Sequence, residues 1–200
     1  MSEPTVASLL HEAADEGKQV RRHLLVAAAI GLLVGGDSIV VGGTAEEYWT
    51  RDAYHPTDLD ICAPVSRSDE RRLRDAGFDR EGRHWFHPGV PTVAVEFPDS
   101  VIDGDPSKAI TEHVGGADVK VIGVDDLYLD RLRQLTANPT GRSREYMSAM
   151  AIVSARYEDL DYDYIERRLE EVSRNEPKLV EQMRSLDRRI NREARKRITE

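Results

Sequence analysis

The spacing of apolar positions predicts that the chain begins with helices and continues into a short buried strand. Residues 7–33 carry apolar side chains at helical intervals, first in LLHEAADEG and then over a wider face in VRRHLLVAAAIGLLV. The glycines that follow interrupt this pattern. DSIVVGG is a short β-branched run that ends in two glycines, as expected for a strand that stops at a tight turn.

The middle of the chain alternates between helix and strand patterns. TAEEYWTRD predicts a short helix after the glycine turn, and TDLDICAPV alternates polar and apolar residues, which is typical of a strand. SRSDERRLRDAGF predicts a charged amphipathic helix. GRHWFHPG and PTVAVEFP predict two strands that form a hairpin.

The last part of the chain is expected to be helical. A polar stretch at residues 99–117 is expected to contain loop, and DVKVIGV then predicts a strand that leads into the helix DDLYLDRLRQL. Three more helical segments follow a break near residue 137. The fold class is therefore α/β (α+β), a small mixed sheet flanked by helices, and the expected domains are a core with N-terminal helices, 1–136, and a helical C-terminal region, 137–200.

Composition limits the cellular compartments and the partners that we expect for the protein. Cys62 is the only cysteine among the 200 residues, which excludes a disulfide framework and fits a reducing cytoplasm. The longest apolar run, Leu24–Val34, is too short to span a bilayer, so we expect a cytoplasmic protein without a membrane partner. The net charge of −9 argues against broad non-specific adhesion to nucleic acid.

Two aspartates two residues apart are the first candidate for chemistry. Asp58 and Asp60 lie on a predicted strand, so both carboxylates face the same way, with Cα atoms roughly 6–7 Å apart. Such a pair repels unless a cation bridges it, and Mg²⁺ accepts carboxylate and phosphate oxygens. Glu96 in VAVEFP adds a third carboxylate, and if the two strands are neighbours the set is large enough for two Mg²⁺ ions.

The glycine turn provides the complementary half of a nucleotide site. Gly42 and Gly43 would let triphosphate oxygens approach backbone amides at a helix N-terminus, with the Thr44 hydroxyl joining the contact or capping the helix. Arg51, between this turn and the aspartates, is a further candidate triphosphate contact.

SIVVGGTAEEYW, followed by YHPTDLDI and VAVEF, resembles the motifs of the DNA polymerase beta-like nucleotidyltransferase superfamily. The resemblance is closer to the minimal nucleotidyltransferases of archaea and bacteria, beside the abortive-infection type toxin nucleotidyltransferases, and covers residues 20–135. It implies transfer of a nucleoside monophosphate from a nucleoside triphosphate to a hydroxyl of RNA, protein or a small molecule. Arg131 stands where the toxin-type relatives carry a lysine; an arginine can hold a phosphate but cannot transfer a proton at neutral pH.

Other candidates and alternatives remain. His84 and His87 are not expected to share a metal ion, and His55 precedes Pro56 close to the aspartates. One alternative function is a non-catalytic nucleotide- or partner-binding module of a toxin–antitoxin or defence pair, with an antitoxin or helical protein as partner. Another treats the three carboxylates as surface acids of a salt-adapted protein, which would diverge in space.

Overall fold

The chain divides into two compact units. A computed structural model describes residues 3–35, 37–51 and 56–199. The first unit comprises Met1–Tyr48 and His55–Ile122, and the second comprises Trp49–Tyr54 and Gly123–Glu200. The units divide before the helix DDLYLDRLRQL, whereas the sequence analysis placed a boundary after it.

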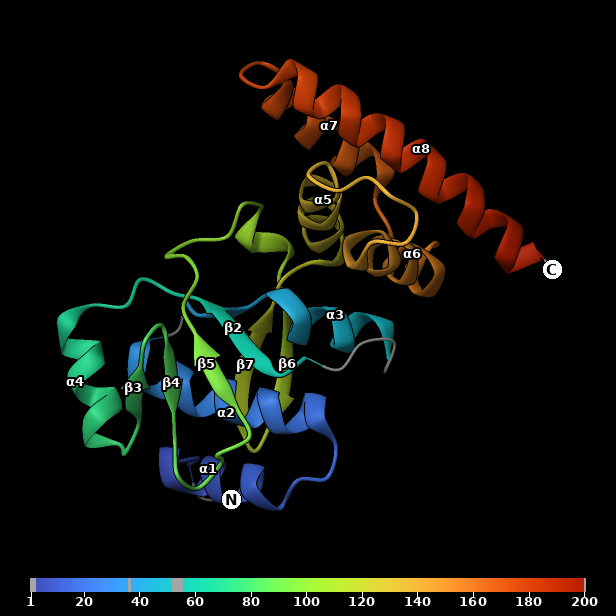
Figure 1. Cartoon of the computed structure of the whole chain (residues 1–200). Helices are drawn as coiled ribbons and strands as arrows, with labels where there is room; N and C mark the ends of the chain where they lie inside the picture. Colours follow the sequence, from blue (N-terminus) through green and yellow to red (C-terminus); the bar gives the residue numbers. More distant parts are fainter. Residues whose placement is uncertain (1–2, 36, 52–55, 200) are drawn as a thin grey trace. The chain divides into compact units, whose positions relative to one another are not determined.

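The first unit is a mixed α/β structure built around one sheet (Figure 1). Its elements, in chain order, are α1 (Val6–Asp15), α2 (Gln19–Val34), β1 (Ile39–Val40), α3 (Gly42–Thr50, whose last two residues belong to the second unit), β2 (Asp58–Cys62), α4 (Arg67–Asp75), β3 (Asp79–Glu81), β4 (His84–Phe86), β5 (Ala94–Glu96), the 3₁₀ helix η1 (Pro106–Lys108), β6 (Ile110–Val114) and β7 (Ala117–Val121).

The seven strands lie in the order β3-β4-β5-β2-β1-β7-β6. β2 pairs parallel with β5 and antiparallel with β1, and β1 in turn pairs parallel with β7. The glycine-turn strand and the aspartate strand are therefore neighbours in the middle of the sheet. Asp58 and Asp60 on β2 therefore lie between β5 on one side and β1 on the other.

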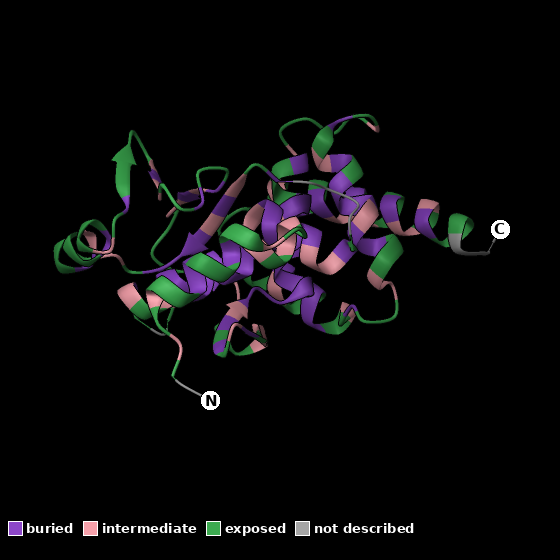
Figure 2. Ribbon diagram, turned by 90° about the horizontal axis from the view of Figure 1, so that it is seen from below, coloured by how far each residue is buried: buried purple, intermediate pink, exposed green. Residues whose placement is uncertain are grey.

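Alternation along the strands separates a buried face of the sheet from a more open one. In β2, Leu59 and Ile61 are fully buried, whereas Asp58 and Asp60 are half-buried. β5 repeats this pattern, with Val95 fully buried between two half-buried residues. Figure 2 colours the described residues by burial. The apolar side chains thus anchor both strands and leave their polar partners on the opposite face.

Helix α2 supplies much of the core of this unit. Nine of its residues are buried, among them an unbroken run from His23 to Ile30, and the helix packs against β2, β6 and β7. The helix α1 before it starts at a capping box between Thr5 and Ser8 and packs along α2. The sequence predicted one or two helices at residues 7–33, and the structure has two.

The second unit is helical. It contains α5 (Val124–Leu135), α6 (Arg144–Arg156), α7 (Tyr162–Ser173) and α8 (Pro177–Thr199). Buried polar groups on α5 are satisfied by the other helices: the Tyr128 hydroxyl donates to Asp187 Oδ1 at 2.9 Å, and Asp126 Oδ1 accepts from the Tyr164 hydroxyl at 2.6 Å. Because its buried side chains pack against α6, α7 and α8, α5 belongs with these helices.

Candidate functional site

The two aspartates of β2 lie on the open face of the sheet, as their spacing predicted. Asp58 and Asp60 are separated by the fully buried Leu59, so their side chains leave the strand on the same side. The central position of β2, between β5 and β1, places both carboxylates among side chains from neighbouring strands.

Glu96 joins the aspartates because β5 pairs with β2. The parallel register sets Asp60 opposite Glu96 and Asp58 opposite Ala94. The sequence placed Glu96 with the aspartates only if their two strands are neighbours, and the structure shows that they are. Asp58 and Glu96 each offer a carboxylate oxygen to one group whose ligand atoms lie within 4.8 Å of one another. The salt-adapted reading expected the acids to diverge, and these two do not.

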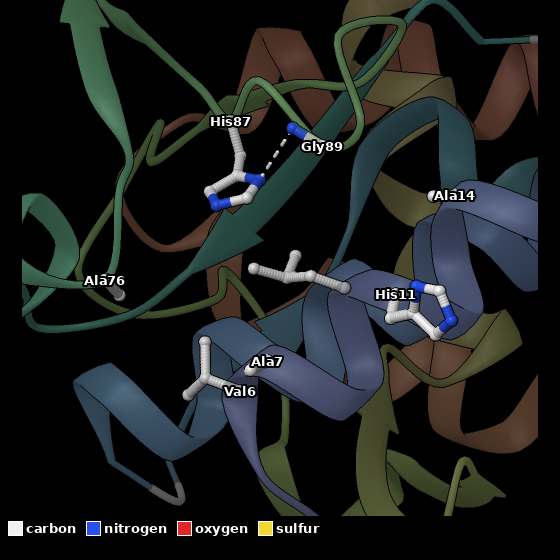
Figure 3. A pocket seen from close by; sticks show the side chains of 8 residues that line it. Val6, Ala7, His11, Ala14, Ala76, His87 and Gly89 are labelled. Carbon is white, nitrogen blue, oxygen red and sulfur yellow. Dashed lines mark hydrogen bonds between the residues drawn. The ribbon is translucent and has the colours of Figure 1, made fainter.

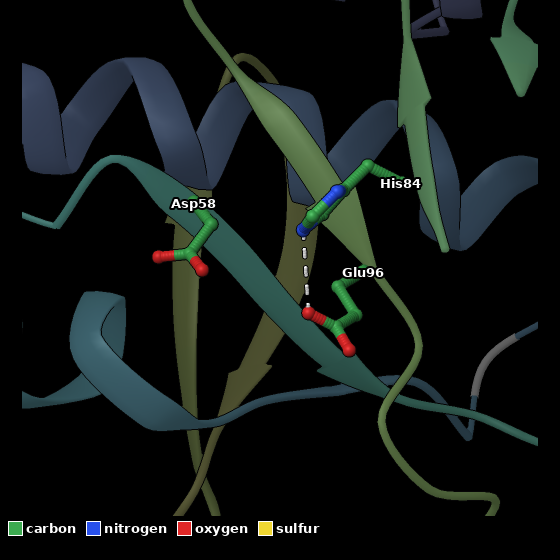
Figure 4. A group of neighbouring side chains, drawn as sticks. All are labelled: Asp58, His84 and Glu96. Atoms are coloured by element: carbon green, nitrogen blue, oxygen red, sulfur yellow. Dashed lines mark ion pairs between the residues drawn. The ribbon is translucent and has the colours of Figure 1, made fainter. Parts of the chain in front are cut away.

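The third member of this group is His84 of β4. The antiparallel register of β4 and β5 sets His84 opposite Glu96, and His84 Nε2 lies 3.4 Å from Glu96 Oε2. Figure 4 shows Asp58, His84 and Glu96 on three neighbouring strands, with the ion pair between His84 and Glu96 dashed. From the sequence, His84 was considered only together with His87, and its approach to the carboxylates was not predicted. The predicted hairpin could have indicated this contact, since the register of its two strands determines which residue lies opposite Glu96.

A positively charged side chain, Arg83, also lies beside Glu96. Arg83 Nε is 3.2 Å from the same Oε2 atom that faces His84, and the arginine side chain is 71% exposed. The Glu96 side chain, by contrast, is only 13% exposed. Glu96 therefore has two nitrogen atoms near one oxygen, and the Arg83 guanidinium partly neutralises its carboxylate.

The glycine turn packs directly against the aspartate strand. The Val41 amide donates to the Asp60 carbonyl oxygen at 3.0 Å, and α3 begins at the next residue. Gly42 has a φ of +60°, and a Cβ atom at this position would lie 2.1 Å from Asp60 Oδ2. The Asp60 carboxylate can therefore lie beside the N-terminus of α3 only because Gly42 has no side chain. Gly43 is the second residue of this helix.

Thr44 has a contact different from those that we expected. It is fully buried, and its hydroxyl donates to the Asp58 carbonyl oxygen at 3.2 Å and lies 2.8 Å from His23 Nδ1. Since α3 already begins at Gly42, Thr44 does not cap the helix. Its hydroxyl is engaged within the fold and fixes the backbone of β2.

The two candidate arginines belong to the second unit. Arg51 is exposed, directly follows α3 and has a φ of 53°. Arg131 is buried on α5, where its Nη1 lies 2.7 Å from Asp130 Oδ2. The carboxylates belong to the first unit, so a triphosphate contact by either arginine remains a prediction.

The remaining histidines of the sequence analysis lie elsewhere. The His87 ring packs on Phe78, and its Nδ1 accepts from the Gly89 amide at 3.0 Å. It lines a mostly apolar pocket of about 380 Å³ beside α1, which contains none of the three carboxylates (Figure 3). His55 lies outside the described residues.

The donor set suits a divalent cation. Two carboxylates and an imidazole are all ligands that such ions accept, and their atoms are close to the spacing of about 3–4.5 Å that ligands around one ion require. Among the described helices, none combines the length and apolar character needed to cross a membrane.

Comparison with known proteins supports the fold. No protein-family model matches the sequence, and no curated protein matches it. The structure resembles that of an antigenic nucleotidyltransferase-like protein from Paracoccidioides brasiliensis, with a TM-score of 0.50 and 14% identity over 84% of this chain and 93% of that chain. The chain therefore has a mixed α/β, nucleotidyltransferase-like fold, and the predicted fold class is confirmed.

Proposed function

We propose that this chain is a metal-dependent nucleotidyltransferase, which moves a nucleoside monophosphate from a nucleoside triphosphate to a hydroxyl group of RNA, a protein or a small molecule. The observation that carries the proposal is the convergence of Asp58 and Glu96 on the open face of the sheet, next to the turn at Gly42 that receives Asp60. The nucleotidyltransferase-like fold supports this proposal, because nucleotidyl transfer would use a group of carboxylates that can bind a cation.

The carboxylates are the residues that would hold the cation. Asp58, Asp60 and Glu96 present oxygen atoms, the ligands that Mg²⁺ prefers, and the sequence predicts a pair of ions. When bound, the cation would neutralise triphosphate charge and make the acceptor hydroxyl more acidic.

The chain's own groups would bind and orient the nucleotide. The backbone amides of the first turn of α3, which begins with Gly42 and Gly43, suit triphosphate oxygens, with Arg51 and Arg131 as further candidates. The acceptor oxygen would form a bond to the α-phosphorus while the bond to pyrophosphate breaks. The acceptor proton would pass to a carboxylate of the group or to water.

Labelled nucleoside triphosphates test the proposal. The protein is incubated with each one, with Mg²⁺ or Mn²⁺, and with total cell RNA and protein, and covalently retained label is measured. We expect Asp58→Asn and Asp60→Asn to lower retention by at least about 100-fold, because each change removes a ligand charge. Asp118→Asn is the control, since Asp118 is an exposed carboxylate paired with His113 at 2.9 Å. Equal retention by all the variants would reject the site.

A binding module without turnover is the second candidate, either for a nucleotide or for an antitoxin or helical partner protein. The ion pair of Arg83 with Glu96 favours it, because the guanidinium neutralises a carboxylate of the group without a metal ion. Triphosphate binding that needs no added metal and leads to no retained label would support this candidate over the transferase.

A further inference from the structure

His84 lies where a nitrogen ligand would complete the carboxylate group. Strand β4 is held in register with β5 on one side and β3 on the other, and the Trp85 side chain is buried on the opposite face of the sheet. This anchoring fixes the direction of His84. The imidazole also lies near the Phe86 ring, with 6.1 Å between the centroids.

The ligand atoms converge from three strands that the sheet holds rigidly. Asp58 comes from β2, Glu96 from β5 and His84 from β4, and the ligand atoms of all three lie within 4.8 Å of one another (Figure 4). All three residues are half-buried, so an ion from solvent can reach them while part of its hydration shell is replaced. Strands hold ligand side chains in place with greater precision than loops do.

We propose that His84 is a ligand of the cation and that the site prefers a divalent transition-metal ion, such as Mn²⁺ or Co²⁺, to Mg²⁺. Mg²⁺ prefers oxygen ligands, whereas imidazole suits the first-row transition ions, whose affinity for such sites rises from Mn²⁺ to Co²⁺. The proposal deepens the metal site of the proposed function and rests on it.

Arg83 provides a matched comparison because it contacts the same oxygen of Glu96 but cannot bind a metal ion. If His84 were only a counter-ion of Glu96, removing either residue would free the carboxylate and strengthen cation binding. If His84 is a ligand, His84→Ala must weaken binding while Arg83→Gln strengthens it. The two variants therefore separate the roles by the sign of the effect.

The experiment measures cation affinity directly on the full chain without nucleotide. Free Mn²⁺ is followed by electron paramagnetic resonance, Co²⁺ by its visible absorption, and Mg²⁺ by competition with Mn²⁺. We expect Co²⁺ to bind more tightly than Mn²⁺, and Mn²⁺ at least about tenfold more tightly than Mg²⁺. His84→Ala should weaken Co²⁺ binding at least about tenfold and Mg²⁺ binding less than about threefold.

A spectroscopic measurement on the unaltered protein does not depend on how the variants fold. Electron spin echo of bound Mn²⁺ should show modulation from a directly coordinated imidazole nitrogen. No such modulation, no cation binding, or equal losses for Mg²⁺ and Co²⁺ in His84→Ala would overturn the proposal. Binding that depends on His84 without nucleotidyl transfer would reject the proposed function alone. Transfer supported equally by Mg²⁺ and Mn²⁺, with no effect of His84→Ala on affinity, would reject the role of His84 alone.

Discussion

Gly42 meets two separate demands on a single residue. Its backbone has a φ of +60°, a conformation that costs an L-residue roughly 1–2 kcal/mol. In addition, a Cβ atom would lie 2.1 Å from Asp60 Oδ2, so any side chain must displace the carboxylate. The first demand concerns stability, and the second concerns the candidate site.

Comparison with Gly82 separates these demands. Gly82 has a φ of +61°, and a Cβ atom there would meet nothing within 4 Å. We expect Gly82→Ala to lower the free energy of unfolding in urea by about 1–2 kcal/mol and to leave cation affinity unchanged. Gly42→Ala should cost more and should also weaken cation binding, because Asp60 must move. Equal effects of the two substitutions on both measurements would contradict the proposed role of Gly42.

At the scale of residues, the sequence predicts the position of a side chain where that position depends on local geometry. It does not predict the position where it depends on how two strands align. Two aspartates two apart on a strand share a face whatever surrounds them, which made Asp58 and Asp60 predictable. The partnership of His84 with Glu96 depends on how two strands align across a hairpin, and this alignment depends on the turn that joins them. The contact of the Thr44 hydroxyl with the buried His23 was likewise not expected, because it joins residues 21 positions apart in the sequence.

At the scale of elements, one buried hydrogen-bond chain joins α2, α3 and β2. The Thr44 hydroxyl has one proton and donates it to the Asp58 carbonyl oxygen, so His23 Nδ1 must be the donor in its contact with Thr44. His23 therefore carries a proton on Nδ1, and its lowered pKa leaves the ring neutral at pH 7. Burial is the main cause that lowers its pKa, the neighbouring Arg22 lowers it further and Asp58 opposes both, so that the pKa is about 4.

The lowered pKa makes the fold sensitive to acid. Between pH 6.5 and about 4 the unfolded chain binds a proton at His23 that the folded chain does not, so stability falls as the pH falls through this range. We expect His23 to contribute a loss of roughly 2–3 kcal/mol between pH 7.5 and 4.5. Urea unfolding at both pH values measures it.

His23→Asn supplies the control, because an asparagine amide can still donate to Thr44 but does not titrate. This variant will be less stable overall, since it leaves part of the buried ring volume empty. Its loss of stability on acidification should nevertheless be smaller than that of the parent by roughly 2–3 kcal/mol. Equal losses in the two proteins would show that His23 does not govern the acid response.

The elements that escaped the sequence analysis are the two edge strands. All three residues of β3 are exposed, and β6 lies within the polar stretch that was expected to contain loop. Each edge strand pairs with only one neighbour, β3 with β4 and β6 with β7. β3 has no buried side chain and β6 has only Val114 buried, so a pattern of apolar residues carries little signal of either strand. The inner strands, with their buried alternate positions, were all expected.

At the scale of the whole molecule, the charge is unevenly distributed along the chain. The net charge of −9 opposes the approach of any polyanion, whether a triphosphate or RNA. Helix α8 differs, since basic residues outnumber acidic ones eight to three within Pro177–Thr199. Arg188 and Arg192 lie four residues apart on it, and both are exposed. An RNA acceptor is therefore expected to contact α8, whereas a small acceptor needs no such surface.

Two matched pairs of arginines test this expectation. Arg67 and Arg71 on α4 are also exposed and four residues apart, so replacing either pair with glutamine changes the net charge equally. We expect the α8 double variant to weaken RNA binding about three- to tenfold at 50 mM salt. The slope of log affinity against log salt concentration should become shallower by the equivalent of about one to two phosphate contacts. The α4 double variant should bind RNA as the parent does, and triphosphate binding should be unchanged in both. Filter binding of RNA between 50 and 200 mM salt measures the effect, and equal weakening by the two pairs would assign it to net charge instead of to α8.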